Sequence, residues 1–124
     1  MNNFLVVDDS FTIREMVSSC IQGEGKKIIK AADGAEALAI AKENTFDFVI
    51  TDFNMPHING LALVEALRKL PQYKSIPILI LATESSPELK LKGKKIGVTG
   101  WILKPINIDT FAGIIEQVMD RYKQ

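Results

Sequence analysis

Five polar residues of the sequence have side chains and positions suited to chemistry on a charged ligand. Each follows a short apolar run, directly or one residue later: Asp8, Asp9, Asp52, Thr83 and Lys104. Three carboxylates that meet in one crevice repel each other and raise one another's pKa unless a cation offsets their charge. Because no histidine or cysteine follows these runs, the all-oxygen ligand set favours Mg²⁺ or Mn²⁺ over zinc.

The threonine and the lysine suit an anion that a magnesium ion also binds. Mg²⁺ held by only a few carboxylates completes its coordination shell with phosphate oxygens, and Lys104 and Thr83 offer an ammonium and a hydroxyl to the same group. A carboxylate can attack phosphorus and become an aspartyl phosphate. Asp52 is the predicted nucleophile because it stands alone after its run, whereas Asp8 and Asp9 are adjacent and better placed to hold a metal. The backbone carbonyl of Asn54 could add a further metal ligand.

These residues can meet only if the apolar runs are strands of one sheet. Short, continuous apolar runs predict strands at 4–7, 28–31, 46–51, 76–82 and 101–103. Apolar residues at helical spacing predict helices between them, starting at Ser10 or Thr12, Asp33, Leu61, Ser86 and Asn107. The first helix is expected to end at Gly23 or Gly25 and the third at Pro71. The run 76–82 is the most apolar and is therefore expected to be the central strand.

Strands that alternate with helices predict an α/β fold, with a doubly wound parallel sheet, helices on both of its faces and right-handed crossovers. In such sheets the ligand site lies at the carboxyl ends of the strands. All five polar residues would then share that edge. The sequence therefore predicts a phosphoryl site there.

Composition limits the remaining possibilities. The 124 residues are 47% apolar and 24% charged, which is typical of one globular domain spanning 1–124. The 15 basic and 15 acidic residues cancel, so the net charge indicates neither nucleic acid nor a membrane surface as partner. No stretch approaches the roughly 18 apolar residues that cross a bilayer, and Met1–Phe4 lacks the basic start of a secretory signal. A cytoplasmic location is expected, and the single cysteine, Cys20, is expected in the core.

Four segments of the sequence together resemble the receiver domain of two-component response regulators, above all the stand-alone regulators of chemotaxis. These segments are Val6–Ser10, Ile50–Pro56, Leu81–Thr83 and Trp101–Pro105. They occur in the family's order at compatible spacings, and the resemblance covers essentially the whole chain. It implies a flavodoxin-like sheet of five parallel strands in the order 2-1-3-4-5.

The resemblance also implies how these residues bind phosphate. Asp9, Asp52 and the Asn54 carbonyl would hold Mg²⁺, and Asp8 would assist through a water molecule. Asp52 would accept phosphate from a phosphohistidine of a sensor kinase. Thr83 and Lys104 would then hold the phosphoryl oxygens.

A conformational switch is the second implication of the resemblance. Thr83 would move toward the phosphate and Trp101 would turn inward, which alters the face formed by the fourth helix, the fifth strand and the fifth helix. The bond before Pro105 is expected to be cis, aiming the Lys104 amine into the crevice. Trp101 is larger than the Tyr or Phe that is common there, so complete inward rotation of the indole is not expected. Glu84 stands where a small residue is usual, and it could restrict access to the site.

The implied function is a phosphorylation-dependent binding switch that catalyses only its own phosphorylation and dephosphorylation. Its partners would be a sensor histidine kinase of the chemotaxis (CheA-like) type, a target such as a flagellar motor switch component, and an aspartyl-phosphate phosphatase. We expect a monomer with no output domain, no nucleic acid and no membrane insertion. A phosphorelay intermediate or phosphate sink that is not linked to the motor is a second possibility.

Two functions of other classes use similar sheet edges. A haloacid dehalogenase-like phosphatase also uses Asp, Thr and Lys with Mg²⁺, but it needs a second acid two residues beyond its nucleophile, where this chain has Asn54. A flavodoxin-like electron carrier needs hydroxyls and amides after the first strand, where Asp8 and Asp9 would repel the flavin phosphate. Each polar residue alone could be an ordinary loop or helix-start side chain, and His57 is expected to be solvated. Their joint placement at one edge favours the phosphoryl site.

Overall fold

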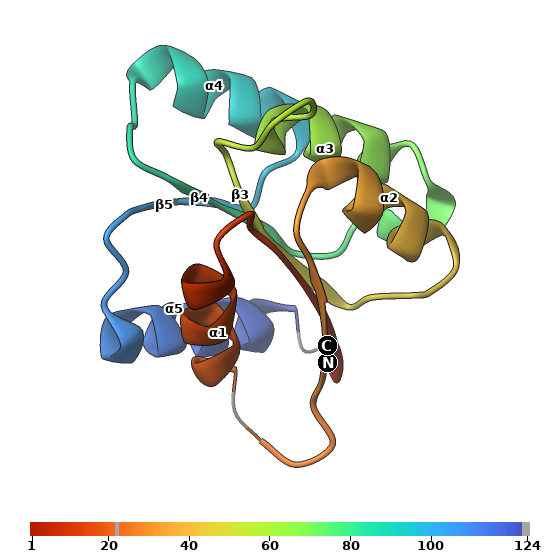
Figure 1. Cartoon of the computed structure of the whole chain (residues 1–124), viewed down its shortest axis with the longest axis vertical. Coiled ribbons are helices and arrows are strands. Elements are labelled where there is room, and N and C mark those ends of the chain that lie inside the picture. Colours follow the sequence, from red (N-terminus) through yellow and green to blue (C-terminus); the bar gives the residue numbers. More distant parts are fainter. Residues whose placement is uncertain (22, 123–124) are drawn as a thin grey trace.

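A parallel five-stranded sheet forms the centre of the molecule, and helices cover both of its faces (Figure 1). The structure is a computed structural model that describes residues 1–21 and 23–122. The strands are β1 (Asn3–Val7), β2 (Lys27–Ala31), β3 (Phe48–Asp52), β4 (Ile78–Ala82) and β5 (Gly100–Leu103). Their order is β2-β1-β3-β4-β5, which confirms the fold and the strand order that the resemblance implied.

Within residues 1–21 and 23–122, four α-helices and one short 3₁₀ turn lie between the strands, and a fifth α-helix follows β5. They are α1 (Phe11–Ser19), α2 (Gly34–Lys42), α3 (Gly60–Arg68), the turn η1 (Pro71–Tyr73), α4 (Pro87–Ile96) and α5 (Ile108–Arg121). Within the described residues, no helix combines the length and the apolar character that a membrane span requires.

A polar side chain caps the start of every α-helix by accepting a hydrogen bond from the amide three residues further on. The capping residues are Ser10, Asp33, Asn59, Ser86 and Asn107. Four of these five starts agree with the sequence prediction, and α3 begins one residue earlier than expected. Pro87 occupies the first turn of α4, where its missing N–H costs no hydrogen bond.

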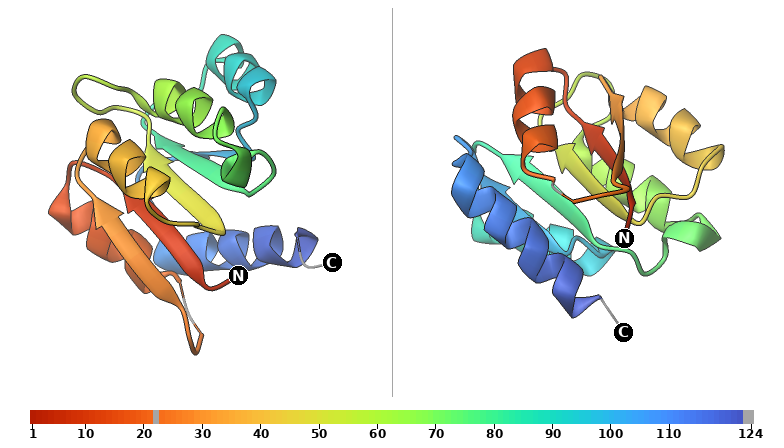
Figure 2. Two further views of the ribbon diagram at one scale, coloured as in Figure 1. Left: turned by 90° about the vertical axis from the view of Figure 1, so that its right-hand side faces the viewer. Right: turned by 90° about the horizontal axis from the view of Figure 1, so that it is seen from below.

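Alternate residues of each interior strand point to opposite faces of the sheet and build two separate core layers. In β1, Leu5 and Val7 pack into one layer, whereas Phe4 and Val6 pack into the other. The first layer lies under α2, α3 and α4, and the second lies under α1 and α5 (Figure 2). Cys20 is only 3% exposed and belongs to the second layer, as predicted.

Several predicted boundaries are wrong by two to six residues, each for a local reason. The first helix ends at Ser19, before Gly23, because Cys20 caps it: the Cys20 N–H donates hydrogen bonds to the carbonyls of Val17 and Ser18. Strand β4 begins at Ile78 because Pro77 has no N–H to donate to a ladder. Strand β3 begins at Phe48. The preceding residue, Asp47, lies outside the strand, and its carboxylate accepts hydrogen bonds from the backbone N–H groups of residues 2 and 3.

Two further predictions about the sheet and the third helix need correction. The central strand is β3, which pairs with β1 and β4. Strand β4 is as completely buried as β3, so its apolar sequence could not distinguish the two positions. Helix α3 ends at Arg68, two residues before the predicted end near Leu70, because Lys69 caps it with backbone hydrogen bonds to Ala66 and Leu67. Pro71 therefore does not close α3 but starts the turn η1.

Candidate functional site

The three predicted carboxylates meet at the carboxyl edge of the sheet. Oxygen atoms of Asp8, Asp9 and Asp52 all lie within 4.8 Å of one another. Asp8 follows β1 and Asp52 ends β3, and the pairing of Val7 with Thr51 aligns these neighbouring strands. Asp8 and Asp52 are buried, whereas Asp9 is exposed. The cluster therefore has a closed floor and an open, acidic rim.

Lys104 extends across the sheet edge to two of these carboxylates. Its Nζ atom lies 3.0 Å from Asp52 Oδ1 and 3.3 Å from Asp8 Oδ2. The residue follows β5, which β4 separates from β3, so only a long side chain can span the gap. The peptide bond between Lys104 and Pro105 is cis, as expected.

Burial and charge shift the pKa values of both partners in this contact. Burial raises the pKa of Asp8, and the nearby Asp52 raises it further, while the Ser10 amide and Lys104 act in the opposite direction. Burial alone would lower the pKa of Lys104, but its contacts with Asp52 and Asp8 outweigh that effect and raise it. Three carboxylates thus face one ammonium, and the site holds excess negative charge.

A divalent metal ion fits this donor set. Asp52 Oδ1 is buried and has no directed hydrogen bond from any described residue, although Lys104 lies close enough to form an ion pair with it. A buried carboxylate oxygen without a hydrogen bond is costly unless a cation approaches it. The donors available around it are oxygens, which are the ligands that Mg²⁺ and Mn²⁺ prefer. The acidic cluster therefore could bind such an ion.

Thr83 and Asn54 lie at the exposed rim of the same edge. Asn54 Nδ2 donates a hydrogen bond to Thr83 Oγ1 over 3.3 Å. Both residues follow interior strands, β3 and β4, and both are exposed. The Thr83 hydroxyl thus faces the loop after β3 and retains its own proton for another acceptor.

Trp101 lies beside this rim on β5 and is half-buried. Its Nε1 donates to the backbone carbonyl of Glu84 over 2.9 Å, and its ring centroid is 5.4 Å from that of Phe53. A Cβ atom placed on Gly93 of α4 would lie 3.5 Å from the indole, an ordinary contact distance, so this helix runs close beside the ring. The indole therefore connects β5, α4 and the residue after Thr83.

Two residues that support the site were not predicted from the sequence. Arg14 of α1 donates from Nη1 to the carbonyl of Asp8 over 2.6 Å, which fixes the chain between β1 and α1. Gly60 approaches β3 so closely that a Cβ atom would lie 2.6 Å from the carbonyl oxygen of Asp52. Arg14 has the sequence signal of an ordinary helix residue. Gly60 stands next to a helix start, a position that by itself does not indicate close packing.

His57 is exposed and has a φ of 69°, consistent with its expected position in solvent.

Comparison with known proteins agrees with this geometry. A model of the response regulator receiver domain matches residues 4–116. Chemotaxis protein CheY-3 of Vibrio cholerae is 33% identical over 118 residues, which cover 94% of this chain and 91% of that protein. Chemotaxis protein CheY of Pseudomonas aeruginosa is 30% identical over 118 residues, covering 94% and 95% respectively.

A solved structure shares both the fold and much of the sequence. The chemotaxis response regulator CheY4 of Vibrio cholerae superposes with a TM-score of 0.87 and is 48% identical, covering 95% of this chain and 98% of that one. Proteins of this class are signalling proteins and not classical enzymes. The matched family model, the chemotaxis relatives and the shared strand order lead to one conclusion: this chain belongs to the response regulator receiver domain family.

Proposed function

We propose that this receiver domain accepts a phosphoryl group on Asp52 from a phosphohistidine of a chemotaxis-type sensor kinase and then binds a target protein. The observation that carries the proposal is the environment of Asp52 Oδ1. This oxygen is buried among two other carboxylates, 3.0 Å from Lys104 Nζ, and no described residue gives it a directed hydrogen bond. A carboxylate oxygen so placed keeps a lone pair for attack on phosphorus.

The proposed transfer forms one bond and breaks another. A carboxylate oxygen of Asp52 attacks the phosphorus of the donor, and the bond between phosphorus and the imidazole nitrogen breaks, with its electron pair returning to the imidazole. Lys104 and the Thr83 hydroxyl would hold the phosphoryl oxygens through charge-assisted hydrogen bonds.

Asp8, Asp9, Asp52 and the backbone carbonyl of Asn54 would hold Mg²⁺ at this site, with Asp8 acting through water. The ion would neutralise the charge that builds up on the transferred group. With three carboxylates at the edge, an incoming phosphate would otherwise meet strong repulsion.

A chain of contacts suggests how phosphorylation would reach the surface. Thr83 directly precedes Glu84, whose carbonyl accepts the hydrogen bond from Trp101 Nε1. A move of the Thr83 hydroxyl toward the phosphate would displace that carbonyl and shift the indole. Moving a two-state switch from 1:99 to 99:1 requires roughly 5.5 kcal/mol, more than two or three hydrogen bonds supply. A partly populated active state is therefore expected before phosphorylation.

The target would dock on the face formed by α4, β5 and α5. This face carries exposed Leu103 and a shallow apolar groove of about 140 Å³ between β5 and α5. Lys90 and Lys94 of α4 lie beside Trp101 at a second groove. An acidic, amphipathic segment of a flagellar motor switch component would complement this surface. We infer that the protein works as a cytoplasmic monomer, with an aspartyl-phosphate phosphatase to reset it.

Phosphorylation can be tested directly by intact mass spectrometry. Purified protein is incubated with Mg²⁺ and acetyl phosphate, and a single phosphoryl adduct that is labile to base is expected. Asp52→Asn should abolish the adduct, whereas Asp120→Asn, the same change on exposed α5, should retain it. An adduct of equal yield on Asp52→Asn would show that another residue is the nucleophile.

The switch can be followed by the fluorescence of Trp101, the single tryptophan of the chain. Phosphorylation should change the emission because the indole contacts the residue after Thr83. Thr83→Ala should reduce the change while adduct formation continues. An unchanged spectrum at full phosphorylation of the wild-type protein would mean that Trp101 does not take part in the switch.

Two roles within the same class can be separated by where the phosphoryl group goes. A motor regulator should bind isolated motor switch proteins more tightly after phosphorylation. A phosphorelay intermediate should instead pass the group to a histidine of a second phosphotransfer protein, and a phosphate sink should lose it to water. We favour the motor role because the relatives named above are chemotaxis proteins.

A further inference from the structure

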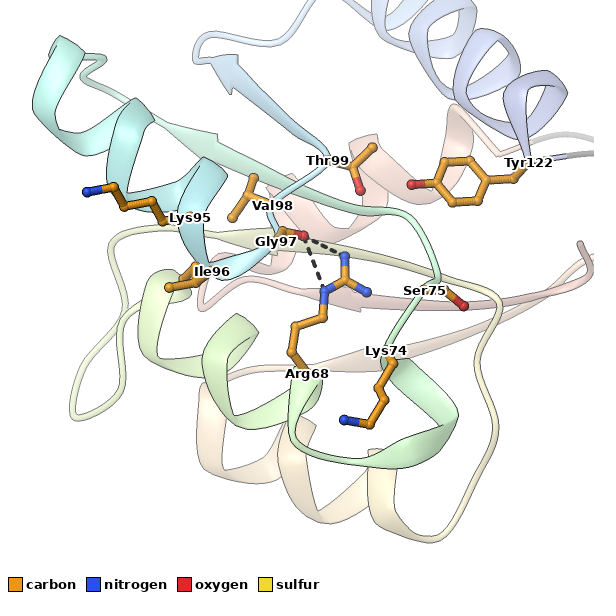
Figure 3. Close-up of a pocket in the computed structure, with 9 residues that line it drawn as sticks. All are labelled: Arg68, Lys74, Ser75, Lys95, Ile96, Gly97, Val98, Thr99 and Tyr122. Atoms are coloured by element: carbon orange, nitrogen blue, oxygen red, sulfur yellow. Dashed lines mark hydrogen bonds between the residues drawn. The ribbon is translucent and has the colours of Figure 1, made fainter.

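A positively charged groove lies at the amino edge of the sheet, opposite the carboxylate cluster. It is open to solvent, has a volume of about 680 Å³ and lies where α3 ends and where β4 and β5 begin (Figure 3). Its polar lining consists of Arg68, Lys74, Ser75, Lys95, Thr99 and Tyr122. Every charged residue of the lining is a cation.

Arg68 is a half-buried residue of this groove, and backbone carbonyls hold its guanidinium. Its Nε donates to the carbonyl of Gly97 over 3.2 Å, and Nη2 donates to the same oxygen. Nη1 donates to the carbonyls of Tyr73 and Ile76 over 2.7 and 2.8 Å. A guanidinium has five N–H donors, so these four contacts leave one Nη2 donor for a ligand.

The charge of this guanidinium is not neutralised by the protein. Among residues 1–21 and 23–122, no carboxylate oxygen lies within 4.0 Å of a nitrogen of Arg68. The ion pairs in this part of the chain join Lys30 to Glu15, and Lys104 to Asp8 and Asp52. Burial lowers the pKa of Arg68, although arginine remains protonated near neutral pH. Carbonyl dipoles satisfy donors but carry no net charge. A bound anion would supply the missing countercharge.

Two hydroxyl groups lie on the open side of the guanidinium. The Tyr122 hydroxyl points toward Thr99, and both side chains lie across the groove from Arg68 (Figure 3). Thr99 Oγ1 already accepts the amide of Ile78 over 2.9 Å, so its own proton remains available to a ligand. Lys74 and Lys95 are exposed at the rim, where their ammonium groups add positive charge.

We propose that this groove binds a phosphate group, either free or carried by a nucleotide. Donors on several sides and three cations suit a multiply charged, tetrahedral oxyanion better than a single carboxylate. The proposal goes beyond the proposed function, because it involves neither Asp52 nor Mg²⁺. The ligand would contact the segment between α4 and β5, close to Trp101.

An NMR titration of the full chain can test the proposal. The Asp52→Asn variant is used in the presence of a magnesium chelator, which excludes phosphate binding at the carboxylate cluster. Inorganic phosphate is added at constant ionic strength, with chloride as the matched salt. Saturable shifts are expected at the Gly97 and Thr99 amides and at the Arg68 Nε–H signal. ADP should bind more tightly than phosphate if nucleotides are the ligand, and equally if the phosphate group alone is recognised.

Charge variants give the control. Lys74→Gln with Lys95→Gln should weaken phosphate binding about fivefold, and Tyr122→Phe should weaken it about twofold. Lys42→Gln with Lys92→Gln removes the same charge from exposed sites outside the groove and should weaken binding less than about twofold. All of these variants retain Arg68 and its contacts. The proposal is overturned if phosphate causes no saturable shift beyond that of chloride, or if both lysine pairs weaken binding equally.

Discussion

Lys104 is the residue on which the charge balance of the site depends most. It contacts Asp8 and Asp52 together, and its side chain is only 17% exposed. Removing one partner of a buried ionic contact leaves the other charges uncompensated, which costs more than the contact itself contributes. Substitution of this lysine therefore has consequences for stability as well as for phosphate binding.

We expect Lys104→Met to lower the free energy of unfolding in the absence of Mg²⁺ by about 2–3 kcal/mol, because two buried carboxylates lose their cation. Mg²⁺ should restore part of the loss. Urea unfolding with and without Mg²⁺ measures both effects. Lys90→Met, the same change at an exposed site of α4, should alter stability by less than about 0.5 kcal/mol. Equal losses in the two variants would contradict this account of Lys104.

Cys20 gives a second prediction at the scale of one residue. Burial raises the pKa of its thiol, and its Sγ contacts the carbonyls of Met16 and Ile108. Since the thiolate is the reactive form, native protein should react with a disulfide reagent at least about a hundredfold more slowly than protein in urea. Absorbance of the released thiol follows both rates. Rapid native labelling would mean that α1 separates readily from α5.

The polar residues after the strands could be predicted because their types are rare at the ends of apolar runs. The positions of Asp8, Asp9, Asp52 and Lys104 at one edge follow from parallel strands alone. Arg68 could not be recognised in the same way, because an arginine in the last turn of a helix is ordinary. Its charge became notable only when the structure showed carbonyls, and no carboxylate, around it.

At the scale of elements, helix starts were more predictable than strand boundaries. A cap is local chemistry between residues three apart, as with Ser86 and the amide of Leu89. A strand boundary depends on the partner strand, which the sequence does not identify. Phe46 is as apolar as Phe48, but only Phe48 pairs with β1.

Two glycines of helices should respond to substitution in opposite ways. Gly60→Ala should destabilise the protein by about 2–4 kcal/mol, because its Cβ would overlap the Asp52 carbonyl at 2.6 Å. Gly93→Ala would meet only ordinary contacts of 3.4 Å or more and should gain up to about 1 kcal/mol from helix propensity. Thermal and urea unfolding of the two variants and of the wild-type protein measure both changes in stability. Two similar losses would show that α4 has no spare room beside Trp101.

At the scale of the whole molecule, the parallel sheet separates an acidic edge from a basic one. The carboxylates lie at the carboxyl ends of the strands, and the Arg68 groove lies at the amino ends of β4 and β5. A ligand at either edge stabilises the folded chain in proportion to its binding, since the unfolded chain has neither site.

Mg²⁺ should therefore raise the melting temperature. At a concentration of 100 times its dissociation constant, the expected gain in unfolding free energy is about 2.7 kcal/mol. Asp9→Asn should remove most of this dependence and leave the fold intact, because Asp9 is exposed. Scanning calorimetry over a series of Mg²⁺ concentrations gives the measurement, with Asp33→Asn, which keeps an N-cap, as the control. A melting temperature independent of Mg²⁺ would contradict the proposed metal site.

The bend at Gly25, between α1 and β2, offers a practical use of the distance between the two edges of the sheet. Gly25 has a φ of 77°, is exposed, and has no heavy atom within 4 Å of the position that a Cβ would occupy. The bend lies at the amino edge of an outer strand, remote from Asp52 and from the α4, β5 and α5 surface. An epitope or fluorophore inserted after this glycine should therefore leave phosphoryl chemistry and target docking undisturbed, giving a labelled sensor for use in living cells.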